Sequence, residues 1–564
     1  MNLRKPRILP LVLLAALLVL VFAIGSASAA VPPRVSVQIL AVNDFHGNLQ
    51  PPTGSSGRVA TPSGNVDAGG AVYLATWLKT LKAENANTVI VSAGDTIGAS
   101  PLLSALFHDE PTIEAFNDMG VDFNAVGNHE FDEGVAELKR MQKGGCHPVD
   151  GCADGDPFGG ADFQYLAANV FYDGTNQTIF PPYRIKTFKY GVKVAFIGMT
   201  LEGTPNIVTP SAVAGLDFRD EADTVNRLVR QLKNRGVETI VVLVHEGGFP
   251  SSGTEYNACP GISGPIIDIV ERTSDEVDLF ITGHTHQAYN CVIDGRIVTS
   301  ASSFGRIVTK VDLEISRTSK EVQAITAENI IVTRTVPADA TQAALIAKYD
   351  AISAPLANRI IGQITATITR AANAAGESAL GDVIADAQLD ATNDPGLGDA
   401  VIAFMNPGGI RADLTYPSSL AGEGDGNVTY GESFTVQPFG NSMVTKTMTG
   451  ADIKQVLEQQ WLGPNAVTAK ILQVSQGFTY TWSTSAPAGS KVSNIMLNGV
   501  PLDMNATYRV TMNSFLADGG DGFAAFTLGT NPLGGAVDTD ALEAYFQAHS
   551  PVPPGPQNRI TVIP

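Results

Sequence analysis

The chain is poor in basic residues and, beyond its first thirty residues, has no long apolar run. Its 36 lysines and arginines are outnumbered by 56 aspartates and glutamates, which gives a formal net charge of −20. Binding to a nucleic-acid backbone needs a basic face, so we expect no nucleic-acid polymer as partner. We also expect no membrane span in the mature chain. A small anionic substrate is not excluded, because bound divalent cations reverse the local field whatever the total charge.

Cysteine is scarce too, with four in 564 residues. Cys146 and Cys152 lie close together in a loop rich in glycine and aspartate, and Cys259 and Cys291 remain. Four cysteines allow three connectivities, and we predict the pairs 146–152 and 259–291, as suits an exported protein. Free thiols are the alternative, and the lack of any CxxC disfavours a cysteine metal site. The aspartate-rich loop 150–156 lacks the spacing of a calcium loop, so we expect a surface loop closed by a disulfide.

The first thirty residues have the three parts of a secretory signal peptide. Basic residues come first, an apolar run over 8–24 follows, and small residues over 26–30 end the segment. We therefore predict a signal peptide over 1–30, cleaved near Ala29 or Ala30, and a secreted or periplasmic protein. The alternative is an uncleaved anchor, because the apolar run is almost long enough to span a bilayer.

A chain of 564 residues is too long for one core, so we expect more than one domain. Apolar strands are predicted at 35–42, 88–92, 123–126, 192–197, 239–244 and 277–282, with a loop at 51–69 and helices at 71–82 and 222–234. The first domain should cover 35–335. A helix over 338–358 should link it to a second domain over 360–564, with its own helices and strands.

Polar side chains that can bind metals follow five of the predicted strands. In α/β sheets, ligands bind beyond the carboxyl ends of the strands. Seven oxygen or nitrogen ligands without a thiolate suit Zn, Mn, Co or Fe, and seven exceed what one ion needs, so we favour two divalent metal ions. Each short motif alone usually occurs in a loop that binds no metal. The prediction rests on the whole ordered set, in which the motifs follow successive strands. The predicted ligands are Asp44, His46, Asp95, Asn128, His245, His284 and His286.

Two of these motifs place their ligands one residue apart. In an extended backbone, residues i and i+2 face the same side, so we expect Asp44 and His46 to reach one metal together, and His284 and His286 likewise. His129 directly follows Asn128, and Asp132 is three residues further on, close enough to orient the His129 ring. A metal ligand beside a proton donor is typical of a hydrolase.

The order Asp-x-His, Gly-Asp, Gly-Asn-His-Glu, His, Gly-His-x-His resembles the calcineurin-like metallophosphoesterases, and residues 94–101 and 127–132 resemble their 5′-nucleotidase family. The resemblance covers residues 35 to about 550. It implies an α/β fold with a four-layer α/β/β/α metallophosphoesterase sandwich, followed by a mixed α/β substrate-binding domain. It also implies that Asp95 is shared between a metal held by Asp44, His46 and His286 and a second held by Asn128, His245 and His284. His129 would then contact the phosphoryl group, with Asp132 orienting it.

The same resemblance assigns substrate contacts to the C-terminal region. Arg411 would bind phosphate, two phenylalanines would stack on the base, and an aspartate would accept from the ribose. One family feature is absent, because no arginine precedes Glu377 in the expected register and Arg370 lies several positions away. The substrate-binding residues implied are Asn406, Arg411, Phe439, Phe515 and Asp521.

These residues predict a secreted dimetal phosphohydrolase that releases phosphate from nucleotides. The resemblance also implies that its two domains rotate about the linker helix. Alternative main activities are 2′,3′-cyclic-nucleotide phosphodiesterase and UDP-sugar hydrolase. Less favoured are a sulfur-oxidising thiohydrolase and an inactive nucleotide-binding surface protein. The sequence indicates no oligomeric state.

Overall fold

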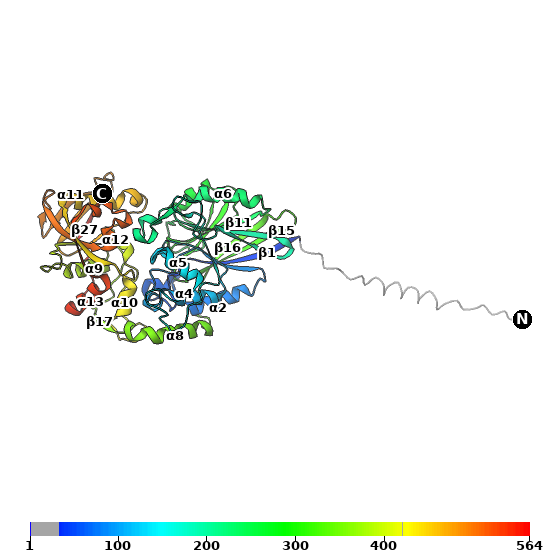
Figure 1. The fold of residues 1–564 in the computed structure, drawn as a ribbon, viewed down its shortest axis with the longest axis horizontal. Coiled ribbons are helices and arrows are strands. Elements are labelled where there is room, and N and C mark those ends of the chain that lie inside the picture. Colours follow the sequence, from blue (N-terminus) through cyan, green and yellow to red (C-terminus); the bar gives the residue numbers. More distant parts are fainter. Residues whose placement is uncertain (2–32, 420) are drawn as a thin grey trace.

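A computed structural model describes Met1 and residues 33–419 and 421–564. The predicted signal peptide, apart from Met1, therefore lies outside the described residues. Figure 1 shows two bodies, one from the blue to green part of the chain and one from the yellow to red part. Within the described residues, no helix is both long enough and apolar enough to cross a bilayer.

The N-terminal body is built on two six-stranded sheets. The first contains, in spatial order, β16 (Val322–Ile331), β15 (Ile307–Ser316), β1 (Arg34–Val42), β4 (Thr88–Ser92), β5 (Phe123–Ala125) and β6 (Gln164–Leu166). The second contains β13 (Ala288–Ile293), β14 (Arg296–Ala301), β12 (Leu279–Thr282), β11 (Thr239–His245), β9 (Lys193–Thr200) and β8 (Tyr183–Thr187). The central pairs β1–β4, β4–β5, β9–β11 and β11–β12 are parallel, so their carboxyl ends lie at one edge of each sheet.

Side chains along each central strand alternate between two cores. Ile39 of β1 and Val241 of β11 belong to one buried cluster between the sheets, whereas Leu40 and Val242 pack outward against helices. This follows from the two-residue period of a strand that is buried on both faces. One outer face is covered by α2 (Ala71–Lys82), α4 (Glu110–Met119) and α5 (Gly134–Lys143). The other is covered by α6 (Glu221–Lys233) and α7 (Ile266–Arg272). The predicted four-layer α/β/β/α sandwich is confirmed.

The C-terminal body is mixed α/β, as predicted. Its five-stranded sheet has the order β21 (Gln473–Val474), β18 (Ile402–Met405), β25 (Thr507–Asn513), β20 (Ser442–Thr449) and β26 (Thr530–Val537). A four-stranded sheet contains β24 (Val500–Pro501), β23 (Val492–Leu497), β22 (Phe478–Ser483) and β27 (Ile560–Ile563). The helices are α9 (Ala379–Asp390), α10 (Tyr430–Val436), α11 (Gly450–Glu458), α12 (Ser514–Ala517) and α13 (Asp538–His549).

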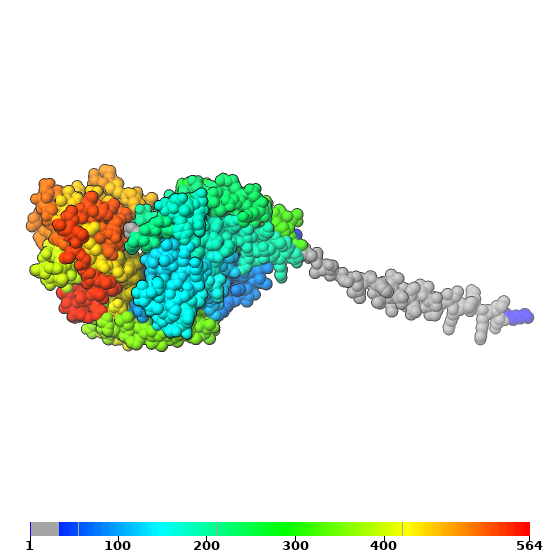
Figure 2. Space-filling view, viewed as in Figure 1, coloured from blue at the N-terminus to red at the C-terminus, as the bar shows by residue number. Residues whose placement is uncertain are grey.

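Helix α8 (Ala340–Ala357) lies beside both bodies (Figures 1 and 2). It contacts α2, α3 (Leu102–Ala105) and α4 on one side and α10 on the other. A helix was predicted here over 338–358, and the exact domain boundaries around it stay a prediction.

Two local predictions have clear outcomes. Both predicted disulfides are present, between Cys146 and Cys152 and between Cys259 and Cys291. The loop predicted at 51–69 was wrong in part, because β2 (Arg58–Thr61) and β3 (Gly64–Asp67) pair there as a hairpin. The Gly, Pro and Ser residues that suggested a loop supply the turns, and the short strands between them lack a long apolar pattern.

Candidate active site in the cleft

The structure brings all seven predicted ligands together where the carboxyl ends of the two sheets meet. Asp44 and His46 follow β1, and Asp95 and Asn128 follow β4 and β5. His245 ends β11, and the remaining two histidines follow β12. The donor atoms form two groups, within each of which all lie within 4.8 Å of one another. The groups are Asp44, His46 and His286, and Asp95, His245 and His284.

In the first group, the His46 Nε2 atom lies 3.1 Å from His286 Nε2, which lies 3.4 Å from Asp44 Oδ1. In the second, Asp95 Oδ2 lies 2.9 Å from His245 Nε2. The same Asp95 oxygen is 3.7 Å from His46 Nε2, so this carboxylate stands between the groups.

Asn128 completes the second group. Its Oδ1 atom lies 3.2 Å from His245 Nε2 and 3.0 Å from His284 Nδ1. Ligand atoms bound to one ion at about 2.1 Å are separated by roughly 3.0–3.4 Å in octahedral and tetrahedral geometry. Most donor separations in both groups lie close to that range, and the distance of 3.9 Å between His46 Nε2 and Asp44 Oδ1 is longer. The residues therefore fit divalent metal ions.

Two ring orientations also suit metal binding. The Nδ1–H of His46 donates to the Gly98 carbonyl at 2.8 Å, and that of His245 donates to the Ala93 carbonyl at 2.8 Å. Each bond selects the tautomer whose Nε2 lone pair points into the cluster. The two carbonyls thus fix the tautomer and the orientation of each ring, as hydrogen-bond acceptors behind metal-binding histidines do.

Electrostatics points the same way at four of the ligands. Burial raises the pKa of Asp44 to about 7 and lowers that of His284 to about 3. Burial also holds the pKa of His46 and His286 well below the usual value. At His245, burial acts to lower the pKa, but the charge of Asp95 outweighs it and raises the pKa to about 10. Buried carboxylates without a counter-charge are costly, whereas neutral imidazoles are good ligands. A divalent cation would supply the charge that this polar cluster lacks.

The backbone that aims these ligands is not extended. Five of the ligands have positive backbone φ angles. These are Asp44 (50°), His46 (48°), Asp95 (50°), His284 (70°) and His286 (55°). Our reason for pairing residues i and i+2, an extended backbone, was therefore wrong. Asp44 and His46 still share one donor group, but His284 and His286 lie in different groups. Non-glycine residues in this left-handed region cost roughly 1–3 kcal/mol each, and such strain concentrates at functional sites.

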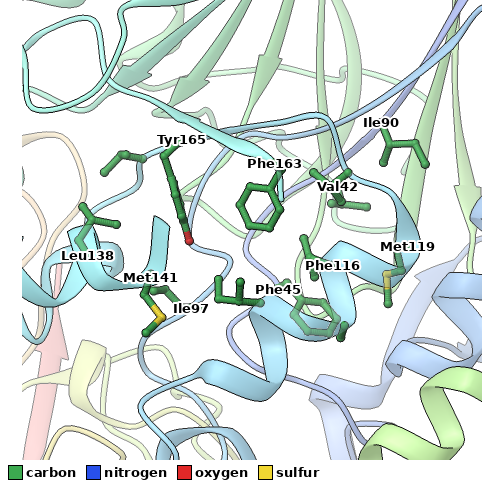
Figure 3. Packing of buried hydrophobic residues seen from close by; sticks show 14 of the residues in the cluster. Val42, Phe45, Ile90, Ile97, Phe116, Met119, Leu138, Met141, Phe163 and Tyr165 are labelled. Atoms are coloured by element: carbon green, nitrogen blue, oxygen red, sulfur yellow. The ribbon is translucent and has the colours of Figure 1, made fainter. Parts of the chain in front are cut away.

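Phe45 explains how the first pair is held. Its side chain is 1% exposed and packs on Phe116 of α4, with ring centroids 5.0 Å apart (Figure 3). Because Phe45 is anchored in the core, Asp44 and His46 on either side of it are directed into the cluster. The ligand loop is thus fastened by a hydrophobic contact.

Glu130 is a site residue that the sequence reasoning missed. Its buried carboxylate accepts from the backbone N–H groups of Asp95, Thr96 and Gly127 at 2.9, 2.8 and 2.6 Å. It therefore ties the loop after β4 to the loop after β5. Burial raises the pKa of Glu130 to about 8. Its place directly after His129 in the Gly-Asn-His-Glu motif was the available signal.

His129 faces the substrate side of the cluster. Its Nδ1 lies 2.9 Å from Asp132 Oδ2, and its ring stacks on Phe439 with centroids 5.7 Å apart. Burial acts to lower the pKa of His129, but the charges of Asp132 and Asp95 outweigh it, and the net pKa is raised. The site therefore favours an imidazolium beside the metal-ligand groups.

A cavity of about 290 Å³ joins the two bodies at this point. Its lining includes Asn128 and His284 and every predicted catalytic and substrate-binding residue. These are His129, Asp132, Asn406, Arg411, Phe439, Phe515 and Asp521.

The carboxylate of Asp521 is already engaged at this cavity. One of its oxygens accepts from Asn406 Nδ2 at 2.9 Å, and the other accepts from the Lys470 ammonium. Lys470 was missed by the sequence reasoning, since no motif surrounds it and its partner is 51 residues away.

The charge of a second arginine, Arg370, affects residues of the cleft. Burial and then the charge of Arg370 lower the pKa of Arg411, and both guanidinium charges contribute to the low pKa of His286. Arg370 Nη1 donates to the Ile410 carbonyl at 3.3 Å, directly before Arg411. Arg370 thus lies behind Arg411, although it does not itself line the cavity.

Comparisons with known proteins agree with this architecture. The calcineurin-like phosphoesterase profile matches residues 37–288, and the 5′-nucleotidase C-terminal domain profile matches 360–528. Cell wall protein Lmo0130 of Listeria monocytogenes is 33% identical over 560 residues, covering 93% of this chain and 68% of that protein. Endonuclease YhcR of Bacillus subtilis is 33% identical over 522 residues, and the match spans 91% of this chain but 40% of that protein.

The crystal structure of a 5′-nucleotidase precursor from Thermus thermophilus superposes with a TM-score of 0.77, at 25% identity, over 94% of this chain and 99% of that one. These matches agree on one family. The chain belongs to the 5′-nucleotidase family of calcineurin-like phosphoesterases, which are metal-dependent phosphoric ester hydrolases.

Proposed function

We propose that this protein releases phosphate from nucleotides, using two divalent metal ions drawn from Zn, Mn, Co and Fe. The observation that carries the proposal is the cavity in which Phe439, Phe515 and Arg411 from one body face His129 and the ligand cluster of the other. A phosphoester bound there would have its phosphate at the ligand cluster and its base between the rings.

The proposed ligands are divided between the two ions in the same way as the two donor groups. Asp44, His46 and His286 would hold one ion, and Asn128, His245 and His284 the other, with Asp95 bridging. Divalent ions held there supply Lewis acidity, which polarises phosphoryl oxygens and makes water a better nucleophile at neutral pH.

The chain's own side chains would then position and neutralise the substrate. His129, kept protonated by Asp132, would stabilise or protonate the leaving alkoxide. Arg411, backed by Arg370, would neutralise the phosphate through planar guanidinium contacts.

The far end of the cavity suits a nucleoside. Phe439 and Phe515 would stack on the base, a contact that tolerates different bases. Asp521, held by Asn406 and Lys470, would accept from the ribose hydroxyls.

The wider organisation is also part of the proposal. Residues 35–335 would form the catalytic domain and 360–564 the substrate-binding domain, with rotation about the helix at 338–358 opening and closing the cleft. Cleavage near Ala29 or Ala30 would place the mature protein outside the cell or in the periplasm. The same site could use 2′,3′-cyclic nucleotides or UDP-sugars as main substrates.

Phosphate release by the purified protein tests the proposal. The substrates should be AMP, ADP, UDP-glucose and 2′,3′-cyclic AMP, each with and without chelator. Because one relative is named an endonuclease, single-stranded DNA and RNA belong in the same panel. We expect turnover of mononucleotides that chelator abolishes and Zn²⁺ or Mn²⁺ restores. Turnover that survives complete metal removal would refute the metal mechanism.

A further inference from the structure

One strand of the N-terminal body ends at the cleft without supplying a predicted metal ligand. Strand β9 ends at Thr200 and lies parallel to β11, which ends at the predicted ligand His245. The chain after β9 therefore reaches the same edge of the sheet as the ligands. We call residues 201–213 the β9 loop. None of the seven predicted ligands belongs to it, so it brings other chemistry to the cleft.

The β9 loop lines the cavity and meets the C-terminal body there. Its residues Ile207, Val208 and Thr209 are part of the wall of the 290 Å³ cavity. Directly before them, η4 (Thr204–Asn206) contacts η9 (Gly520–Gly522) of the C-terminal body. The loop is thus a place where the two bodies touch at the cavity.

The segment that the β9 loop touches belongs to the nucleoside end of the proposed site. Helix η9 contains Asp521, the proposed ribose acceptor, and it contacts α12, which contains Phe515. A base lying between Phe439 and Phe515 would therefore have the β9 loop beside it. This places part of the nucleoside pocket on the body that carries the ligand cluster.

Core packing fixes the direction of Ile207. The neighbouring Val208 is 3% exposed and Val213 is 6% exposed, and both belong to the main hydrophobic cluster of the N-terminal body. The Ile207 N–H donates to the Thr204 carbonyl at 3.0 Å, and the buried Thr204 hydroxyl donates to the Leu201 carbonyl at 2.8 Å. Ile207 itself is only half-buried. An anchored loop thus presents uncovered aliphatic surface to the cavity.

We propose that Ile207 is a specificity-determining residue that packs on the nucleobase from the N-terminal body, while Phe439 and Phe515 stack on it from the C-terminal body. The inference rests on the proposed nucleotide hydrolysis and deepens its nucleoside-binding part. Covering aliphatic carbon with a base removes apolar surface from water, and this gain does not depend on which base is bound. A base would touch both bodies at once, so the site would favour nucleotides over sugar phosphates that lack a base.

The contact is tested with AMP and ribose 5-phosphate, which share the reacting phosphoester and differ by the base. In Ile207→Ala, we expect kcat/KM on AMP to fall about tenfold, through KM, and hydrolysis of ribose 5-phosphate to stay as in the wild type. Tenfold is about 1.4 kcal/mol, which suits partial burial of the three carbon atoms removed. Ile352→Ala is the matched control, since Ile352 is 43% exposed and is not part of the cavity wall. It should change neither substrate.

Adenosine binding separates this inference from the proposed function, because binding needs no turnover. In isothermal titration calorimetry, the Kd for adenosine should rise about tenfold in Ile207→Ala and stay unchanged in the control. Ile207→Trp, which fills the base end of the cavity, should abolish adenosine binding and leave ribose 5-phosphate hydrolysis intact. Circular dichroism checks that each variant is folded.

The two proposals fail on different results. A wild type that binds adenosine but releases no phosphate from AMP would refute the proposed hydrolysis and leave the role of Ile207 standing. Equal adenosine affinity in the wild type and Ile207→Ala, equal losses on AMP and ribose 5-phosphate, or no adenosine binding by the wild type would overturn the role of Ile207.

Discussion

Replacing His129 by Ala is the most direct test of the division of labour in the cleft. The ring touches Asp132 and stacks on Phe439, but it is not among the proposed metal ligands. A positioned proton donor contributes about 10²–10⁴-fold, or roughly 3–5 kcal/mol of transition-state stabilisation. We therefore expect kcat on AMP to fall by about that factor.

The leaving group distinguishes proton donation from general damage. An alkoxide leaving from AMP needs a proton or a positive charge, whereas p-nitrophenolate is a stable anion. His129→Ala should therefore lose much less activity on p-nitrophenyl phosphate than on AMP. Phosphate release is measured on both substrates, and bound metal on the same samples. Asn128→Ala, a change in a proposed ligand, is the control that should lose metal.

Two results would refute this reasoning. Equal losses on AMP and p-nitrophenyl phosphate would show that His129 does not act on the leaving group. Metal loss in His129→Ala as large as in Asn128→Ala would show that His129 supports the ligand cluster instead.

Three further predictions address substrate binding, packing and pH. Lys470→Met should raise KM for AMP by about 10- to 150-fold with kcat little changed, because a hydrogen bond to the Asp521 carboxylate is worth about 1.5–3 kcal/mol. An unchanged KM in steady-state kinetics would contradict this. Phe116→Ala should cost about 3–5 kcal/mol of unfolding free energy, since this fully buried ring supports Phe45, and denaturant melts measure the loss. Burial raises the pKa of Glu221 from 4.5 to about 7, so the unfolded chain releases this proton first and stability falls as pH rises between those values. Glu221→Gln should remove this loss of unfolding free energy, which is on the order of 2 kcal/mol. Denaturant melts at pH 5 and pH 8 measure it. If the variant loses as much stability as the wild type between these pH values, the assignment to Glu221 is wrong.

Much of the fold could be predicted because local patterns report it directly. The boundaries of α2 and β4 match the predicted ranges, since amphipathic spacing and a continuous apolar run set them. The ligand set could be named because parallel strands deliver their carboxyl-end loops to one edge, so polar residues after separate strands meet. The hairpin within 51–69 was missed because its strands are short and half-exposed.

What the sequence by itself determined is therefore the identity of the chemical groups and the strands that carry them. Only the tertiary structure decided how those groups are aimed. Core packing of Phe45 holds Asp44 and His46 in a left-handed backbone that no local pattern favours. The same holds for Lys470 at Asp521 and for Arg370 behind Arg411, because contacts between residues far apart in the chain depend on how the whole fold closes.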